Sequence, residues 1–253
     1  CEERGYALWE YVREREPEDA WPHLRRVWMT MHDAIERGLH AEGVLPGELG
    51  LARKAWTFYR KATLAGPALQ RPGLLSAYAL AVSEENASGG VVVTAPTCGS
   101  CGIVPAVLKY LQGKLECSNE SIVHALATAG LIGNLAKHNA SISGAEVGCQ
   151  GEVGVACAMA AGAGAQLMGG TTRQVESGAE TALVHNLECF CDAPMQHAPP
   201  RSAKAVVGRL AQFGVGEVVS FPTMRRRVSH DVTPPELVEA AHQPVFILIT
   251  DPH

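Results

Sequence analysis

The segment 137–154, KHNASISGAEVGCQGEVG, combines side chains that can bind or react with a small polar ligand. Hydroxyl, amide and carboxylate groups alternate in it with four glycines and the thiol of Cys149. Glycine lets a ligand approach the backbone closely, and a thiolate can bind a metal ion. A purely structural turn rarely needs so many polar groups beside so many glycines. The segment is therefore predicted to form a ligand site, on a loop or a broken helix start.

A second group of reactive side chains is the CGSC sequence at 98–101. C-x-x-C spacing occurs in redox pairs and in half of a zinc site, but Cys117 and His124 do not supply the second half. The loop lacks the patterns of phosphate loops, although its backbone N–H groups could bind a small carboxylate. Two interpretations of Cys98 and Cys101 stay open: a redox or metal function, or packing in a tight loop.

Further cysteines occur in HNLECFCD at 185–192, where Cys189 and Cys191 follow His185 at the expected end of a helix. Isolated cysteines are more often small buried residues than ligands, so this spacing alone is weak evidence for a metal site.

The elements that must position these groups are mostly helical by their apolar spacing, with Gly and Pro between them. The run Val153–Thr172 is interpreted as a buried helix and not as a membrane span, because Ala and Gly make it too weakly apolar. Strand-like runs occur at 91–96 and at 245–250. Helices are expected at 17–40, 50–64, 73–86, 103–111, 119–138 and 172–189. A further helix is expected to follow the glycine-rich segment and to end at residue 168.

Composition narrows the class of protein further. Of 253 residues, 47% are hydrophobic but only 6% aromatic, so small side chains must form a tightly packed helical core. The net charge of −5 argues against a nucleic-acid binder. Eight cysteines favour a metal or cluster site in a reducing compartment over a disulfide framework. The first residues lack a signal-peptide pattern, and the chain is interpreted as a piece of a longer protein.

Four runs of the sequence resemble the iron–sulfur L-serine dehydratases, also called L-serine ammonia-lyases, in their α domain or α subunit. They are MHDAIERGLHAEGVLPGEL (31–49), ALAVSEENASGGVVVTAPTCGSCGIVPAVLKY (79–110), NASISGAEVGCQGEVGVACAMAAGA (139–163) and HNLECFCD (185–192). The resemblance covers roughly residues 20–192. It implies a mainly α fold with short extended segments and glycine-rich loops. A helical domain like the α domain of these dehydratases, incomplete at its N-terminus, is expected at 1–194. A divergent tail that does not match the family is expected at 195–253.

The resemblance also implies a chemistry. A [4Fe–4S] cluster held by three Cys thiolates would leave one iron open as a Lewis acid for the β-hydroxyl of L-serine. Loss of the α-proton and of water would lead through aminoacrylate to pyruvate and ammonia. No PLP is expected, since no lysine lies in a recognisable PLP context. The implied setting is cytoplasmic amino-acid catabolism and gluconeogenesis. A β domain or β subunit and a dimeric assembly are the implied partners, with no nucleic acid and no membrane.

Residue by residue, Cys149 and Cys191 match the first two cluster ligands. Ser202 stands where the third cysteine is expected, which leaves Cys101 and Cys189 as candidates. Cys101 or Cys98 could serve only if their loop borders the cluster, and Cys189 only after a rearrangement, because it is so close to Cys191. Lys137, His138 and His185 are candidates by position for the base that takes the α-proton. The implied substrate-binding residues are Thr94, Pro96, Thr97 and Gly99 in the TAPT-x-G loop, and Asn139, Ser141, Ser143 and Gly144 in NASISG.

Three other hypotheses stay open beside this one. The chain could be an inactive remnant of the same fold that lost the cluster with the third ligand. It could belong to a related lyase that acts on L-threonine or L-cysteine. It could also be a redox protein that forms a Cys98–Cys101 disulfide.

Overall fold

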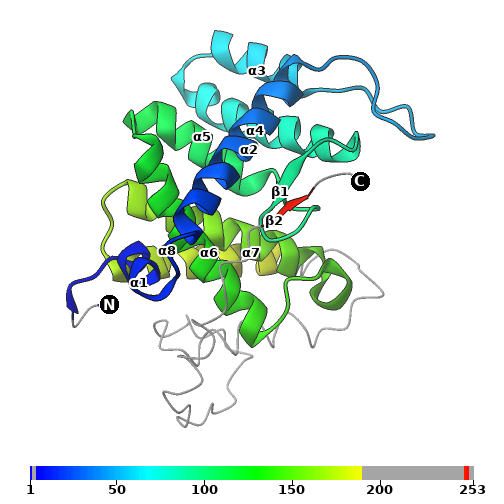
Figure 1. Cartoon of the computed structure of the whole chain (residues 1–253). Coiled ribbons are helices and arrows are strands. Elements are labelled where there is room, and N and C mark those ends of the chain that lie inside the picture. The colour runs from blue at the N-terminus through cyan, green and yellow to red at the C-terminus, as the bar shows by residue number, and fades with distance from the viewer. Residues whose placement is uncertain (2–3, 190–247, 251–253) are drawn as a thin grey trace.

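A computed structural model describes residues 1, 4–189 and 248–250 of the chain, and backbone only from 187 on (Figure 1). Within these residues the fold is mainly α, as predicted. The helices are α1 (Leu8–Arg15), α2 (Ala20–His40), α3 (Ala55–Leu64), α4 (Pro67–Ala87), α5 (Ile103–Leu115), α6 (Asn119–Asn139), α7 (Gly144–Leu167) and α8 (Thr172–Cys189). The strands are β1 (Val92–Thr94) and β2 (Leu248–Thr250).

The helices lie close to the expected ranges, and their differences have local causes. Helix α4 begins at Pro67, six residues before the expected start, because proline fits the first position of a helix. It continues through Pro72, which the sequence analysis treated as a break. Helix α6 begins as predicted, with the Ser118 hydroxyl accepting a hydrogen bond from the Ser121 N–H at 3.1 Å.

The core is built from helices that bury small residues. Helix α7 packs against α5, α6 and α8, and its Ala and Gly positions are largely buried. The interpretation of 153–172 as a buried helix is confirmed up to about residue 164, whereas α7 ends at Leu167 and Met168 is exposed. Among the described residues, no helix has the length and apolar content needed to cross a bilayer. Larger side chains complete the core on α2 and α6, including Trp28, Met31 and Leu126.

A two-stranded sheet precedes the CGSC loop. Strand β1 pairs antiparallel with β2, with Val93 opposite Ile249 and Thr94 opposite Leu248. Both strands fall within the runs expected to be extended. Residues near the end of the chain therefore lie beside the segment that leads into the TAPT-x-G loop (Figure 1).

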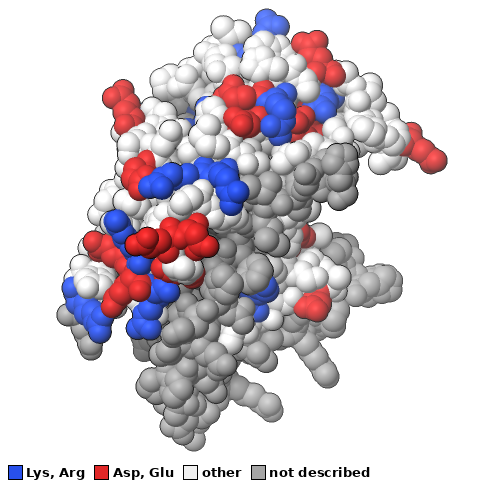
Figure 2. Space-filling model, viewed as in Figure 1, with Lys and Arg blue, Asp and Glu red and all other residues white. Residues whose placement is uncertain are grey.

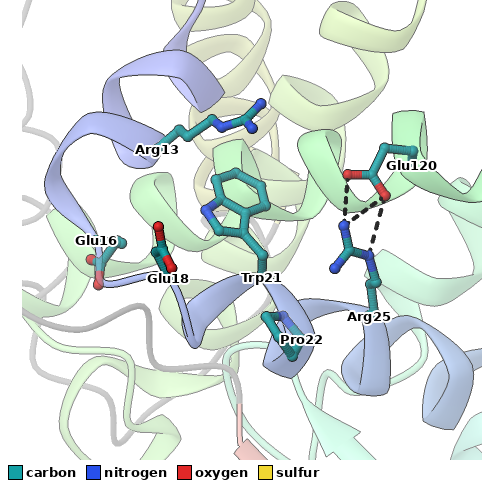
Figure 3. Close-up of a pocket in the computed structure, with 7 residues that line it drawn as sticks. All are labelled: Arg13, Glu16, Glu18, Trp21, Pro22, Arg25 and Glu120. Carbon is teal, nitrogen blue, oxygen red and sulfur yellow. Dashed lines mark hydrogen bonds and ion pairs between the residues drawn. The ribbon is translucent and has the colours of Figure 1, made fainter.

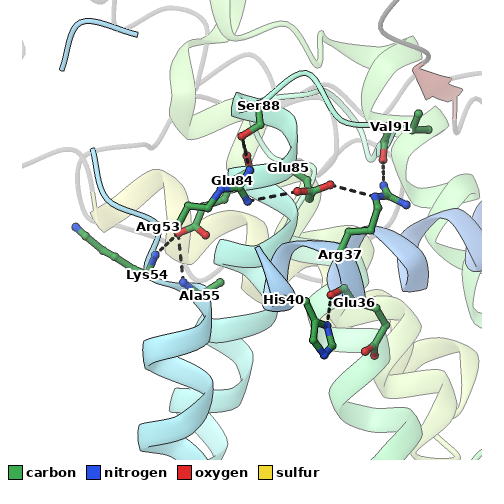
Figure 4. Close-up of polar contacts among 10 residues, drawn as sticks. All are labelled: Glu36, Arg37, His40, Arg53, Lys54, Ala55, Glu84, Glu85, Ser88 and Val91. Carbon is green, nitrogen blue, oxygen red and sulfur yellow. Dashed lines mark hydrogen bonds and ion pairs between the residues drawn. The ribbon is translucent and has the colours of Figure 1, made fainter. Parts of the chain in front are cut away.

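Two buried carboxylates on α4 connect three other segments (Figure 4). Glu84 accepts hydrogen bonds from the backbone N–H groups of Lys54 at 2.6 Å and Ala55 at 3.3 Å, at the start of α3. Glu85 forms ion pairs with Arg37 at 3.1 Å and Arg53 at 3.3 Å.

The same network reaches the sheet. Arg37 on α2 donates a second hydrogen bond to the Val91 carbonyl at 2.7 Å, directly before β1. The buried charges of α4 therefore hold both the start of α3 and the approach to the TAPT-x-G loop.

The surface toward the viewer in Figure 2 carries acidic and basic side chains interspersed with each other.

Close packing of α2 on α4 gives a test of the fold. A Cβ added at Gly38 would meet the Ala81 backbone, 2.6 Å from its carbonyl carbon and 2.8 Å from its Cα. G38A should therefore lower the free energy of unfolding by about 1–3 kcal/mol through overpacking. Gly113 on α5 has nothing within 4 Å of the added Cβ, so G113A should raise it by about 1 kcal/mol. Equal effects of the two substitutions in denaturant unfolding would contradict this packing.

Candidate functional site

The two segments that the sequence analysis singled out converge on one carboxylate, that of Glu152. The Thr97 hydroxyl donates a hydrogen bond to Glu152 Oε1. A Cβ added at Gly99 would lie 2.5 Å from Oε1, and one at Gly144 would lie 2.7 Å from Oε2. The TAPT-x-G loop and the NASISG segment, far apart in the sequence, are therefore neighbours across this side chain.

The TAPT-x-G loop leaves β1 at Thr94 and reaches Thr97 through a cis Ala95–Pro96 peptide bond. Its polar groups bond within the loop and to α4. Thr97 Oγ1 lies 3.2 Å from the hydroxyl of Ser100, which is buried. The Asn86 side-chain amide on α4 donates to the Cys98 carbonyl at 3.2 Å. These contacts fix the tight loop that was predicted for residues 97–102.

The NASISG segment joins α6 to α7. Asn139 is buried, and its amide donates to the Leu135 carbonyl at 2.8 Å. The Ser141 hydroxyl accepts from the Ser143 N–H at 3.1 Å and donates to Glu146. Helical structure begins at Gly144, so the segment closes against the first turn of α7.

Helix α7 is broken directly before Cys149. Gly148 has φ of 74° and ψ of 171°, a conformation that L side chains rarely adopt. The helix resumes beyond it, so Cys149 and Glu152 lie one turn apart on the same side. Cys149 is exposed and its thiol is not in a disulfide. The predicted broken helix start is confirmed, and Cys149 directly follows the break.

The CGSC cysteines differ from each other. Both thiols are free, but Cys98 is exposed and Cys101 is buried. Burial, helped by the nearby Cys98 and Glu152, raises the pKa of the Cys101 thiol to about 12, although a backbone hydrogen bond partly opposes the shift. Cys101 is therefore a neutral thiol at physiological pH, and a metal bound there would have to displace its proton.

The cluster ligands implied by the resemblance are only partly covered by the structure. Cys191 and Ser202 lie outside the described residues, and so does the side chain of Cys189. In the described ranges, no three His, Cys, Asp or Glu side chains come together in a group that could hold a metal ion. Cys149 is thus the one expected ligand whose side chain can be located.

The three candidate bases lie at the ends of two helices. Lys137 and His138 are exposed in the last turn of α6, immediately before Asn139. His185 is exposed on α8. Their positions leave the choice among them open.

Sequence reasoning gave no role to several polar residues that the fold brings together. Lys109 Nζ on α5 lies 2.6 Å from His32 Nε2 and 3.0 Å from Glu36 Oε1 on α2. Glu152, despite lying in the glycine-rich segment, was also given no role. The i, i+4 spacing of His32 and Glu36 was a visible signal of a shared helix face. Nothing in the sequence pointed to Thr97 as the partner of Glu152.

A separate cavity of about 400 Å³ opens between α1, α2 and the start of α6 (Figure 3). The Arg13 guanidinium lies over the Trp21 ring, 5.8 Å from its centroid. Arg25 forms a two-pronged ion pair with Glu120, at 3.0 and 3.2 Å. Charges of both signs line this cavity, and it shares no residue with the two loops around Glu152.

Differential alkylation tests the contrast between the two CGSC thiols. At about pH 8, a thiol with a pKa of about 12 has roughly one molecule in ten thousand as thiolate, so iodoacetamide should label Cys98 and spare Cys101. The unfolded chain, in which both thiols are exposed, serves as the control and should be labelled at both. Equal labelling in the folded protein, or a reversible disulfide between the two under oxidation, would contradict the burial of Cys101.

The environment of His124 predicts a pH dependence of stability. Its ring stacks on Trp9 with centroids 3.7 Å apart, and burial lowers its pKa below the ordinary 6.5, with Arg13 and Arg25 adding to the shift and Glu120 opposing it. At pH values below the ordinary histidine pKa of 6.5, the unfolded chain binds the proton more readily than the folded chain. The free energy of unfolding therefore falls as the pH falls.

The matching variant is H124Q, which removes the titrating group. Unfolding free energy measured from about pH 7.5 to about pH 5 should fall more steeply for the wild type than for H124Q. Parallel pH profiles would show that His124 does not contribute.

Comparisons with known proteins show the family of the chain. The family described as serine dehydratase alpha chain matches residues 3–199. L-serine dehydratase of Haemophilus influenzae is 48% identical over 202 residues, which are 76% of this chain and 44% of that protein. L-serine dehydratase TdcG of Escherichia coli is 53% identical over 172 residues, 66% of this chain and 38% of that protein. The chain therefore spans less than half the length of these relatives. It belongs to the serine dehydratase alpha chain family.

Proposed function

We propose that this chain forms the α part of an L-serine ammonia-lyase, which converts L-serine to pyruvate and ammonia. The convergence of the TAPT-x-G loop and the NASISG segment beside Cys149 carries the proposal, because it gathers hydroxyls, backbone N–H groups and a thiol in one place. Relatives named L-serine dehydratase support the choice of substrate.

A [4Fe–4S] cluster is the proposed cofactor. Cys149 fits it, since this residue is exposed, its thiol is free, and it directly follows the helix break at Gly148. Cys101 stays a candidate for the third ligand, but its thiol is buried, and a cluster bound there would have to displace its proton. Cys191 is the second proposed ligand, and Cys189 stays a candidate for the third because Ser202 cannot supply a thiolate. When bound, the cluster supplies Lewis acidity toward the β-hydroxyl that leaves.

The protein's own groups have the tasks of binding and proton transfer. The TAPT-x-G loop, with Thr94, Pro96, Thr97 and Gly99, and the NASISG segment, with Asn139, Ser141, Ser143 and Gly144, are proposed to hold the carboxylate and amino groups of L-serine. The base that takes the α-proton is proposed among Lys137, His138 and His185. PLP has no part in the proposed reaction.

The remaining proposals concern the assembly. A β domain or β subunit is proposed to complete the enzyme, because the chain spans 44% or less of its cited relatives. A dimeric assembly and a cytoplasmic location in amino-acid catabolism and gluconeogenesis follow from the family resemblance.

Activity of the reconstituted enzyme tests the proposal. The full chain, supplied with a β part from a relative and loaded with iron and sulfide without oxygen, should release pyruvate and ammonia from L-serine. C149S should lose the cluster absorbance and detectable turnover, since a ligand is removed. C157S is the matched control: Cys157 lies on the same helix, half-buried, and its loss should leave both readouts within about twofold.

The opposite outcomes identify the other hypotheses. Folded protein that binds no iron and releases no pyruvate would point to an inactive remnant. Faster turnover of L-threonine or L-cysteine than of L-serine would point to a related lyase.

A further inference from the structure

Glu152 holds a central position that the proposed reaction does not yet use. Its side chain is half-buried on α7, one turn after Cys149. Oε1 accepts the hydrogen bond from Thr97, and Oε2 is directed toward Gly144. Each oxygen of one carboxylate therefore faces a different loop.

The glycines at 99 and 144 have their explanation in this carboxylate. Neither has a positive φ, so backbone conformation does not require glycine at either position. A Cβ at Gly99 would approach Glu152 Oε1 to 2.5 Å, and one at Gly144 would approach Oε2 to 2.7 Å. Real side chains do not make such contacts, so alanine at either position would push the carboxylate away. The two glycines make room for Glu152 between the loops.

The hydrogen bonds also fix the direction of the Thr97 hydroxyl. Its single proton is donated to Glu152, so in the 3.2 Å contact between the two hydroxyls Ser100 must be the donor. Thr97 Oγ1 consequently faces its surroundings as an acceptor. An acceptor hydroxyl beside a carboxylate attracts an ammonium group and repels a carboxylate.

We propose that Glu152 is a positioning residue that fixes the TAPT-x-G loop against the NASISG segment and makes the Thr97 side of the pocket the subsite for the substrate's α-ammonium group. The loop-fixing role stands on the contacts alone. The ammonium subsite rests on the proposed function, since it takes an amino acid as the substrate.

Hydrogen exchange of the full chain tests the loop-fixing role without any need for turnover. E152A removes the hydrogen bond from Thr97 and the carboxylate next to Gly144, so amide exchange should rise together at 97–102 and at 141–144. E152Q keeps the shape of the side chain and should give a smaller rise in the same two segments. E14Q, which makes the same charge change at an exposed position of α1, should alter neither. A rise in only one segment, or in neither, for both Glu152 variants would overturn the role.

A comparison of two ligands tests the ammonium subsite. In the cluster-loaded enzyme with its β part, E152Q should raise KM for L-serine about tenfold or more, the scale of one charge-assisted hydrogen bond, with a smaller change in kcat. L-glycerate carries the hydroxyl and carboxylate of L-serine but no ammonium, so its inhibition constant should change less than about threefold. Equal weakening of both ligands would overturn the subsite.

The two experiments also separate this inference from the proposed function. Wild-type enzyme that binds a cluster but does not turn over L-serine would refute the proposed function and, with it, the ammonium subsite. The exchange measurement would still decide whether Glu152 holds the two loops together. E152Q serves both experiments even if E152A does not fold.

Discussion

Close approach between helix backbones is the constraint on which the rest of this structure depends. Helix α4 is the clearest case. On one side its Ala81 backbone leaves no room for a side chain at Gly38 of α2, and two residues earlier its Ala79 carbonyl lies 2.5 Å from where a Cβ of Gly102 would be. The second contact places the end of the TAPT-x-G loop directly against α4. Small residues here do more than fill the core, because they determine where the loop can lie.

The buried carboxylates of α4 hold particular neighbouring segments in place beside these close contacts. A buried carboxylate is costly unless it is paired, so Glu85 must keep Arg37 and Arg53 within reach. Arg37 in turn holds the Val91 carbonyl at the start of the approach to β1. The segment before the loop is therefore held by charge pairs and the end of the loop by steric contact. Thr97 lies in the chain between these two attachments, which together limit its position relative to α7.

Most of the helices could be predicted because apolar spacing and capping residues are local signals, as Ser118 at the start of α6 illustrates. The start of α4 at Pro67 was missed because proline was taken as a break, although it is also a good first residue of a helix. The two segments that converge on Glu152 were singled out by their residue types. The contact between Thr97 and Glu152 was not, because it joins residues 55 positions apart and depends on how α7 packs.

The surroundings of Glu152 suit a molecule that carries both charges. The TAPT-x-G loop leads into the N-terminus of α5, and the NASISG segment leads into the N-terminus of α7. Helix N-termini present backbone N–H groups and partial positive charge, which favour a carboxylate. The carboxylate of Glu152, together with that of Glu146 in the first turn of α7, favours an ammonium. A zwitterionic amino acid can satisfy both at once, whereas a simple anion would be repelled by Glu152. The proposed ammonium subsite thus gives the carboxylate of Glu152 a task among glycines and hydroxyls that would otherwise bind any small anion.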